Sequence, residues 1–586
     1  MSMESSTGKR VGVEVGLFAC VILGAVLRVR GLTWQVPMDD EWHGIDFALS
    51  HDLWFLFTHF SRAGANSVPW NLYLRGALDT IGWSEVTIVL PSLLAGVGLL
   101  WLFPRWIARR FGAVPALVSA ALLAISPFLV FYSRMARAYS VVLFLECFAL
   151  LALLDWLREA RRRQVLALVV FGAFAIWTHA AALASMLGAL TAAIAWRTFL
   201  ARRNPACLAP TVRQMVMATL AMLALAGGLW LPALSQPLPA PTIPAARFSL
   251  GTFLGLVQLW SGSANSLLEL ACMILVVGGG WLLARFARSE LLVFTAAVVG
   301  ALVAVLLTRP NLADASFVLA RYLLPAYLLG SLAVGVAAQA IVRAAASATG
   351  RTLRLGAVFA SIAFLYFLGP LPRIHGATNS FTKHPAFQAS YREQDPDRVL
   401  PDPLDDGISV AVRRSQLQPF YARLAREPGR APIIEYPFLL GEDANLLYFA
   451  QQLHGRPVLA GYYASGAQDR DVFGMEVAGG AAQSRVSGGY IVNATMVDHV
   501  LGNWSHDRRI RFRTVVNILD PDVVARSGAE YLVLHGNLLR EFFHIGPARV
   551  QSNFVTRIRP GLTARYGPPV VETDLITVFR LTERPR

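Results

Sequence analysis

The chain has 586 residues, of which 55% are hydrophobic and only 15% are charged, and its mean hydropathy is +0.50. This composition excludes an ordinary soluble globule and is typical of a polytopic membrane protein. The net charge of +15 does not indicate a nucleic-acid partner, because most of the excess lies in the apolar part, where 27 Lys and Arg stand against 15 Asp and Glu up to residue 372.

Eleven apolar runs approach the length of about 20 residues that a helix needs to span a bilayer. They lie near residues 12–32, 86–104, 113–131, 139–157, 164–179, 181–197, 215–233, 266–284, 290–308, 318–342 and 353–372. With the N-terminus inside, cytoplasmic segments receive 18 of the 27 basic residues up to residue 372, as the positive-inside rule requires. We therefore predict a membrane domain over residues 1–372 of a multi-pass protein of the bacterial inner membrane. An odd number of spans then places residues 373–586 in the periplasm.

Two long loops and the tail lie on the outer side in this topology. The first loop, 33–85, contains an aromatic and apolar stretch at 52–60 that predicts a helix in the membrane interface. The second loop, 235–265, is rich in proline. In the tail, strand-like segments alternate with helical patterns, which predicts a small mixed α/β domain. The strands are expected at 431–437, 457–460, 531–535 and 570–581, the helices at 444–453 and 521–527, and irregular structure at 375–410.

Acidic residues gather where the first outer loop begins. Asp39, Asp40 and Glu41 are adjacent, and His43 follows them. Carboxylates beside lipid are costly unless they act on something or bind something, and the alternative is a solvated loop without chemistry. Such a carboxylate can serve as a general base, or the three together can hold Mg²⁺ or Ca²⁺, which prefer oxygen ligands. The residues alone leave both interpretations open.

Cationic side chains gather on the same predicted face. Arg134 and Arg137 lie in the turn between the third and fourth spans, and they share one side of that turn if it is helical. Arg309 and Arg321 lie near the start of the tenth span, and His179 lies at the outer end of the fifth. Fixed cations can hold a phosphate leaving group and stabilise its developing charge. Arginines at a membrane boundary also snorkel to headgroups, and an interfacial histidine is often only a packing residue.

One carboxylate lies inside a predicted span. Glu146 is about two turns below the outer face of the fourth span, roughly 10 Å deep at ~1.5 Å per residue. An intramembrane carboxylate is a functional candidate, and the alternative is an ion pair with an interior arginine.

Several of these segments together resemble the GT-C glycosyltransferases, nearest the branch of protein O-mannosyltransferases and lipid A aminoarabinose transferases. The resemblance covers roughly residues 12–330. It rests on the order of Asp40-Glu41, Ser67-Val-Pro-Trp-Asn-Leu-Tyr-Leu with Ser84-Glu85, Ile125-Ser-Pro-Phe-Leu-Val-Phe-Tyr-Ser-Arg-Met-Ala-Arg-Ala-Tyr-Ser, Trp177-Thr-His-Ala and Ala320-Arg-Tyr-Leu-Leu-Pro. The chain departs from the family at Val68-Pro69, where a double proline is usual.

The resemblance implies a GT-C fold, a polyprenyl-phosphate sugar donor and an inverting transfer outside the membrane. Asp40 matches the family's catalytic aspartate and Glu41 its partner, with Asp39 as an extra carboxylate. Arg137 matches the arginine of the Ser-x-x-Ala-Arg-x-Tyr segment, which ends at Tyr139. His179 matches the histidine of the Thr-His segment.

The sequence therefore predicts a membrane glycosyltransferase that uses a polyprenyl-phosphate sugar, with neither the sugar nor the acceptor specified. The expected base is Asp40, with Asp39 or Glu41; the expected phosphate ligands are Arg134, Arg137, Arg321 and Arg309; and the expected supporting residues are His179, His43, Tyr139 and Glu146. The alternatives are a lipid or solute transporter with the same cationic vestibule, and a non-catalytic assembly protein of the cell envelope. The enzyme is favoured because the charges crowd the outer face and do not line a path through the membrane.

Overall fold

The computed structural model of the chain describes the residues that follow. They are 4–30, 32, 41, 44–45, 47–48, 51–59, 67–82, 84, 86–203, 210–234, 248–263, 265–310, 316–368, 391–393, 409–411, 419–429, 431, 433–436, 454, 456, 458–459, 529–535, 559–573 and 576–581. The chain divides into two compact units. Met1–Leu32, Ser67–Trp70 and Val89–Ala389 form the first, and Thr33–Asn66, Asn71–Ile88 and Ser390–Arg586 form the second. The predicted domain boundary at residue 372 lies outside the described residues and stays a prediction.

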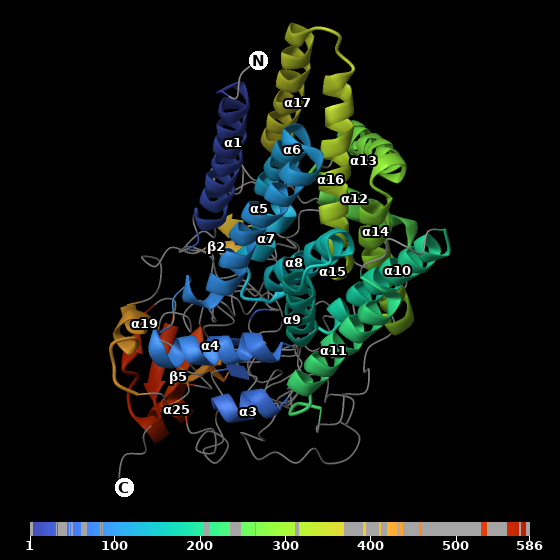
Figure 1. Cartoon of the computed structure of the whole chain (residues 1–586). Coiled ribbons are helices and arrows are strands. Elements are labelled where there is room, and N and C mark those ends of the chain that lie inside the picture. Colours follow the sequence, from blue (N-terminus) through green and yellow to red (C-terminus); the bar gives the residue numbers. More distant parts are fainter. Residues whose placement is uncertain are drawn as a thin grey trace. The chain divides into compact units, whose positions relative to one another are not determined.

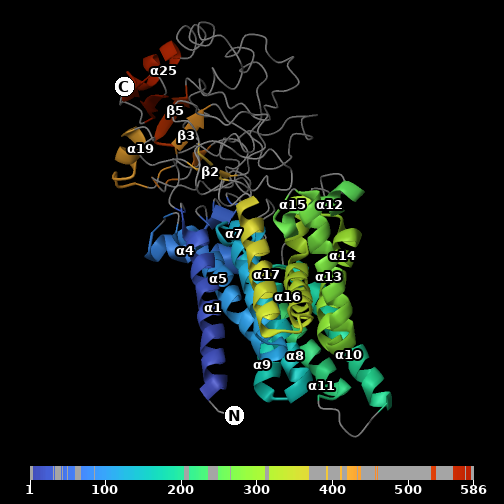
Figure 2. The same ribbon diagram turned by 90° about the horizontal axis from the view of Figure 1, so that it is seen from above.

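The first unit is built of helices, many of which run broadly along one direction (Figures 1 and 2). A helix lies at each of the eleven predicted spans. In order these are α1 (Glu4–Val29), α5 (Leu90–Phe111), the pair α6 (Ala113–Ile125) and α7 (Pro127–Ser133), α8 (Tyr139–Glu159), α9 (Arg162–Thr178), α10 (Ala181–Arg203), α11 (Val212–Trp230), α13 (Ser266–Phe286), α14 (Arg288–Thr308), the pair α15 (Ser316–Tyr322) and α16 (Leu324–Arg343), and α17 (Ala348–Leu368). Within the described chain, nine helices are long and apolar enough to cross a membrane, and the bent pair α6–α7 is a tenth candidate. The predicted polytopic helical fold is confirmed.

Two of the predicted spans are broken. The run predicted at 113–131 bends by 61° between α6 and α7, because Pro127 has no N–H to donate to the carbonyl four residues before it. The run predicted at 318–342 is interrupted at Leu323, two residues before Pro325. Hydropathy stays high across both breaks, so an apolar window alone does not reveal them. The predicted loop 235–265 also differs, since its last part forms α12 (Leu250–Ser261).

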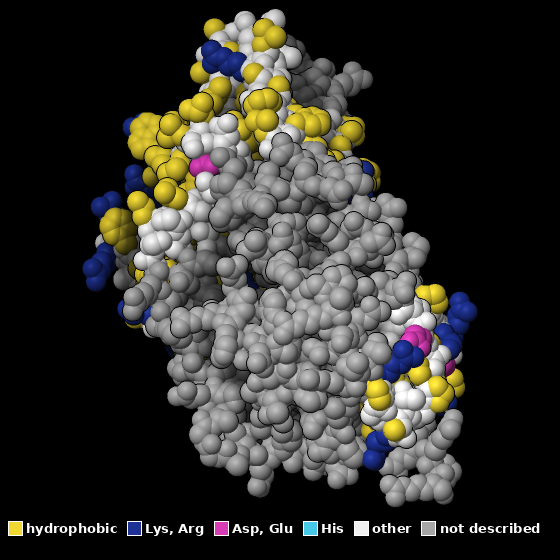
Figure 3. Space-filling model, turned by 180° about the vertical axis from the view of Figure 1, so that it is seen from behind, with side chains coloured by type: hydrophobic (Ala, Val, Ile, Leu, Met, Phe, Trp, Pro, Cys, Tyr) yellow, Lys and Arg dark blue, Asp and Glu magenta, His cyan; other side chains and the backbone are white. Residues whose placement is uncertain are grey.

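The surfaces of these helices are apolar. Figure 3 shows hydrophobic side chains spread over much of the described helical surface. Leu267 and Val277 of α13 are 77% and 69% exposed, and Leu307 of α14 is 79% exposed. Contiguous exposed apolar surface on this scale is costly in water and normal against lipid. The chain is therefore a multi-pass membrane protein.

The described residues of the second unit form several helices and two sheets. The helix predicted at 52–60 is α3 (Leu53–Thr58), which Asp52 caps by accepting a hydrogen bond from the Phe55 N–H at 2.8 Å. The helix α4 (Val68–Thr80), whose first residues belong to the first unit, is followed by the 3₁₀ turn η2 (Thr87–Val89). Contrary to the expectation of irregular structure at 375–410, β1 (Tyr391–Glu393) lies there and pairs in parallel with β2 (Ser409–Ala411).

The larger sheet confirms the strands predicted in the tail. Its order is β4-β3-β5-β7-β6. β3 (Ile433–Tyr436) is parallel to β4 (Val458–Leu459) and to β5 (Tyr531–His535), and β7 (Ile576–Arg580) is antiparallel to β5 and to β6 (Val571–Glu572). Short helices α19 (Pro419–Leu424) and α25 (Arg559–Tyr566) complete the described part. The described residues Ile433 and Ile434 of β3, Tyr531 to Leu534 of β5 and Ile576 to Phe579 of β7 are buried, so these central strands are covered on both faces. The helices predicted at 444–453 and 521–527 lie outside the described residues.

A buried ion network supports this sheet. The guanidinium of Arg456, 2% exposed, donates to Glu530 at 2.6 Å and lies 3.5 Å from Glu427. Partial burial acts to raise the pKa of Glu530, but hydrogen bonds from Arg456 and Arg580 outweigh it and leave that pKa below its ordinary value. Two segments far apart in the sequence, one around residue 456 and one at the start of β5, are thereby held together.

Candidate functional site

Five residues of the first unit form a compact group of arginine and aromatic side chains, which we call the Tyr139 cluster: Arg137, Tyr139, His179, Arg321 and Tyr322. The guanidinium carbons of Arg137 and Arg321 lie 5.8 and 5.5 Å from the centre of the Tyr139 ring. The His179 ring lies 5.7 Å from the Tyr139 ring and 6.0 Å from the Tyr322 ring. Both arginines are within the usual range of cation–π contact. Side chains from three distant parts of the chain therefore converge on one tyrosine.

Four members of the cluster lie at helix ends, and Arg137 lies in the turn before α8. Tyr139 is the first residue of α8, and His179 is the C-cap of α9. Arg321 and Tyr322 are the last residues of α15, directly before the break at Leu323. The Arg137 main chain is fixed by the Ser92 hydroxyl, which donates to the Arg137 carbonyl at 2.6 Å. Helix ends place these side chains at one level of the bundle.

Arg28 of α1, which was not singled out from the sequence, stabilises the bend between α6 and α7. Its side chain is 1% exposed and donates to the carbonyls of Leu123 at 3.3 Å and Ala124 at 3.4 Å. Leu123 would bond the N–H of residue 127 in a continuous helix, but that residue is proline, so Arg28 satisfies a carbonyl that the chain itself leaves open. Arg28 also donates to the Ser133 hydroxyl at 3.1 Å, at the end of α7.

Arg134 caps the C-terminal end of α1. It is 1% exposed, and its guanidinium donates to the main-chain carbonyls of Arg30 and, at 3.4 Å, Leu27. These carbonyls lie at the C-terminus of α1, where helical partners are missing. The turn after α7 is not helical, so Arg134 and Arg137 do not share one side of it as expected. Arg134 points into the protein, whereas Arg137 reaches the Tyr139 ring.

A main-chain hydrogen bond identifies the tautomer of the His179 ring. Its Nδ1 accepts a hydrogen bond from the Ala181 N–H at 3.2 Å, so the proton of the neutral ring is on Nε2. The ring therefore offers one N–H donor beside two fixed cations.

The predicted acidic group lies mostly outside the described residues, which include neither Asp39, Asp40 nor His43. Glu41 is described and fully buried. Among the described residues no three His, Cys, Asp or Glu side chains are arranged to hold a metal ion. The choice between a general base and a Mg²⁺ or Ca²⁺ site therefore stays a hypothesis.

The two remaining candidates lie apart from the cluster. Glu146 of α8 is 2% exposed, and its polar neighbour is Ser185 of α10. In the described chain no arginine or lysine forms an ion pair with Glu146, so the expected alternative of a partner arginine is not observed. Arg309 is exposed and caps α14 with φ 43°, and in the part of the chain that is described no ring contact or hydrogen bond joins it to the Tyr139 cluster.

Tyr322 is the member of the cluster that sequence reasoning missed as a candidate. It lies next to Arg321 in the Ala320-Arg-Tyr-Leu-Leu-Pro segment. The motif therefore included Tyr322, but nothing in the sequence indicated a role for its ring. No local pattern marks Arg28, because its partners are 95 to 105 residues away.

The sequence matches no protein-family profile and no curated protein. Among solved structures, the chain is similar to the crystal structure of ArnT from Cupriavidus metallidurans bound to undecaprenyl phosphate, with a TM-score of 0.51, 12% identity, and coverage of 98% of this chain and 99% of that one. The apo crystal structure of that protein gives a TM-score of 0.52 and 12% identity over 99% and 100% of the two chains. The Archaeoglobus fulgidus oligosaccharyltransferase in complex with zinc and sulfate is less similar, with a TM-score of 0.44 and 12% identity over 89% and 68%.

At 12% identity, the likeness to ArnT concerns the fold, and it extends over the whole length of both chains. ArnT is a lipid A aminoarabinose transferase of the GT-C superfamily, which is the branch that the sequence motifs resemble. The chain has the GT-C fold.

Proposed function

We propose that this protein is a glycosyltransferase that moves a sugar from a polyprenyl-phosphate donor to an acceptor hydroxyl, with inversion, at the outer face of the bacterial inner membrane. The single observation that carries the proposal is the convergence of Arg137 and Arg321 on the Tyr139 ring, beside a neutral His179. The fold supports it, because the structural neighbour ArnT is bound to undecaprenyl phosphate.

The arginine pair suits the leaving phosphate. A guanidinium presents a planar fork of N–H donors that matches phosphate oxygens. Both guanidinium groups lie over the Tyr139 ring, which restricts their position. The Nε2–H of His179 adds a neutral donor to the same group. We assign Arg137 and Arg321 to the phosphate, and Arg134, whose contacts bind it to α1, to positioning.

The proposed reaction breaks the bond between the anomeric carbon and the phosphate oxygen and forms a bond from that carbon to the acceptor oxygen. Asp40, with Asp39 or Glu41, takes the proton of the acceptor hydroxyl as its oxygen attacks. The phosphate leaves on its polyprenyl chain with the electron pair of the broken bond, and the two arginines stabilise the added charge. Attack opposite the leaving phosphate gives inversion.

The test uses the full chain in lipid nanodiscs with a panel of polyprenyl-phosphate sugars. One donor is expected to be consumed by the wild type, while Asp40→Asn binds that donor without turnover. Arg137→Ala and Arg321→Ala are each expected to lower kcat/KM by about 10²–10³, the usual loss when one donor to a developing charge is removed. Arg137→Lys and Arg321→Lys should fall in between, because a lysine keeps the charge and loses the fork.

The matched control is Arg285→Ala. Arg285 is also stacked on an aromatic ring, 3.7 Å from the centre of Trp281, but it belongs to the C-terminal end of α13. Its removal should leave kcat/KM within about twofold. Equal losses for Arg285 and the two cluster arginines, or full turnover by Asp40→Asn, would overturn the proposal. Failure of a folded wild type to bind any donor would favour the transporter or assembly alternatives.

A further inference from the structure

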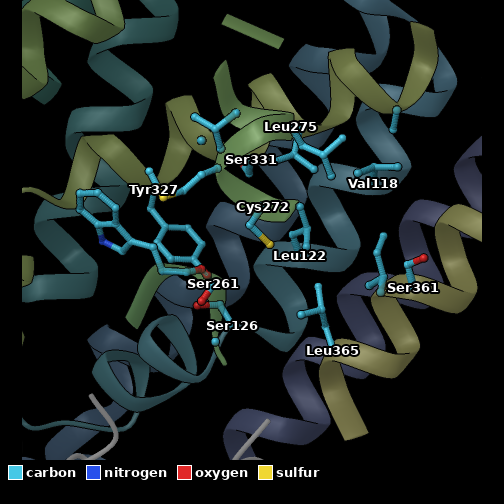
Figure 4. Close-up of a pocket in the computed structure, with 18 of the residues that line it drawn as sticks. Val118, Leu122, Ser126, Ser261, Cys272, Leu275, Tyr327, Ser331, Ser361 and Leu365 are labelled. Carbon is cyan, nitrogen blue, oxygen red and sulfur yellow. Dashed lines mark hydrogen bonds between the residues drawn. The ribbon is translucent and has the colours of Figure 1, made fainter. Parts of the chain in front are cut away.

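A cavity of about 660 Å³ lies in the first unit, among α6, α12, α13, α16 and α17. Figure 4 shows the hydroxyls of Ser126, Ser261 and Tyr327 gathered at one end, whereas Val118, Leu122 and Leu365 give apolar walls further along. The Tyr327 hydroxyl donates to the Trp260 carbonyl at 3.0 Å, so this polar end is already satisfied by the protein. The volume is within the range of about 300–1,000 Å³ that is usual for sites of organic ligands.

The cavity exists because α17 is barely packed against the bundle. Only Ile362 of this helix is buried in the described structure, where it contacts Val118 and Ala338. Nearer the start of α17, Arg354 donates to the Ile341 carbonyl of α16 at 2.9 Å. The space beside these two contacts is lined by apolar side chains and borders the lipid-facing surface.

This space borders the lipid-facing surface, and its wall is mostly apolar. Water is a poor occupant, because a stable buried water needs two to four polar partners, and most of the wall offers none. A hydrocarbon chain from the bilayer matches the wall.

The positive charge of Arg354 at the cavity indicates which lipid headgroup carries the hydrocarbon chain. Arg354 is the charged residue of the lining, it is exposed, and in the described chain no carboxylate forms an ion pair with it. One nitrogen of its guanidinium is used by the Ile341 carbonyl, which leaves further N–H donors for an anion. Basic sites between membrane helices commonly bind the headgroups of anionic lipids. None of the five residues of the Tyr139 cluster lines the cavity.

We propose that this cavity is a binding site for an anionic phospholipid of the surrounding membrane, with one acyl chain between α17 and the helices α6, α13 and α16 and with its phosphate on Arg354. The bound lipid takes the place of side-chain packing and holds α17 on the bundle. This site is independent of the proposed sugar transfer.

The test measures retained lipid. The full chain is reconstituted in nanodiscs of phosphatidylglycerol and phosphatidylcholine in equal parts, released, and examined by native mass spectrometry. Gly330→Leu fills the cavity, because Gly330 lines it and an added Cβ meets no atom within 4 Å. Gly356→Leu is the matched control, since Gly356 of α17 also has open space but does not line the cavity.

The wild type and Gly356→Leu are expected to retain phosphatidylglycerol, and Gly330→Leu to retain at least tenfold less. Arg354→Gln, which removes the charge and keeps an amide N–H that can donate to the Ile341 carbonyl, should remove the preference for phosphatidylglycerol over phosphatidylcholine. Equal retention by Gly330→Leu and the wild type overturns the site, and so does an unchanged lipid preference in Arg354→Gln. Co-purified polyprenyl phosphate that Gly330→Leu removes would show that the donor is the occupant instead. None of these outcomes depends on transferase activity.

Discussion

Replacement of Arg28 by methionine is the most direct test of how the bundle is held together beside the Tyr139 cluster. Methionine keeps most of the length of the side chain and removes the guanidinium. Arg28 makes four hydrogen bonds, to the Ser133 hydroxyl at 3.1 Å and to the carbonyls of Gly24, Ala124 and Leu123 at 2.9, 3.4 and 3.3 Å. Loss of the guanidinium leaves two carbonyls of α6 without this partner.

The expected loss of stability follows from these contacts. Each buried carbonyl left unsatisfied costs about 1–3 kcal/mol, so the two carbonyls of α6 cost roughly 2–6 kcal/mol together. Removal of a buried charge returns part of this, because its desolvation penalty disappears. We expect a net loss of about 3 kcal/mol for Arg28→Met. At ~2–4 °C per kcal/mol, the midpoint of thermal unfolding should fall by roughly 6–12 °C.

Pro127→Ala provides an internal check, because it restores an N–H four residues after Leu123. In the Arg28→Met background this N–H can bond the Leu123 carbonyl, so the double variant should be less destabilised than the sum of the two single changes by about 1 kcal/mol. The measurement is thermal unfolding of the purified proteins in one detergent, with Arg285→Met as a surface control expected within ±0.5 kcal/mol. If Arg28→Met unfolds at the wild-type temperature, or if the two changes are additive, Arg28 does not cap α6.

Three further predictions concern other buried contacts. Glu290→Gln should cost about 1–3 kcal/mol in unfolding experiments, because Glu290 is fully buried and accepts from both Arg110 and Arg158, whose side chains are 40% and 27% exposed and so keep access to water; unchanged stability would contradict a role for this triad in joining α5, α8 and α14. Gly188→Val should prevent the close approach of α10 to α14, since its Cβ would lie 2.2 Å from a main-chain oxygen of α14, and a well-folded monodisperse variant would refute it. In the tail, burial lowers the pKa of His454 to about 3. Between pH ~6.5, where an unfolded histidine titrates, and pH ~3, only the unfolded state binds this proton, so the larger sheet loses stability as pH falls. Hydrogen exchange in β3 and β5 at pH 7 and 4.5 measures this, and equal protection at both values would contradict it.

The membrane fold was open to prediction because its signal is local. A run of apolar residues long enough to cross a bilayer forms a helix whatever surrounds it, since its main chain must bond to itself in lipid. The strands of the tail were also predictable, because Tyr531–His535 is a short, mostly apolar run and β3 begins with the β-branched pair Ile433 and Ile434. The pairing order of these strands was not, because it depends on residues far apart in sequence.

The candidate site was predictable only in part. Arg137, His179 and Arg321 could be chosen from the sequence by their place at predicted helix ends and by motif order. Arg134 could not be separated from Arg137, because the spacing of three residues places them together on a helix, and the turn that carries them is not one. Their opposite directions follow from the bend at Pro127, which brings the end of α7 against the end of α1.

The sequence by itself determined that this protein is a helical membrane protein with a small α/β sheet region, and where its long apolar runs lie. Tertiary structure decided that residues 137, 139, 179, 321 and 322 share one cluster, that Arg28 caps α6 while Arg134 caps α1, and that α17 borders a cavity. The physical reason is the distance along the sequence over which each kind of signal acts. Hydropathy and helix-end signals act within about 20 residues, whereas the positions of these side chains depend on how helices more than 100 residues apart cross and pack.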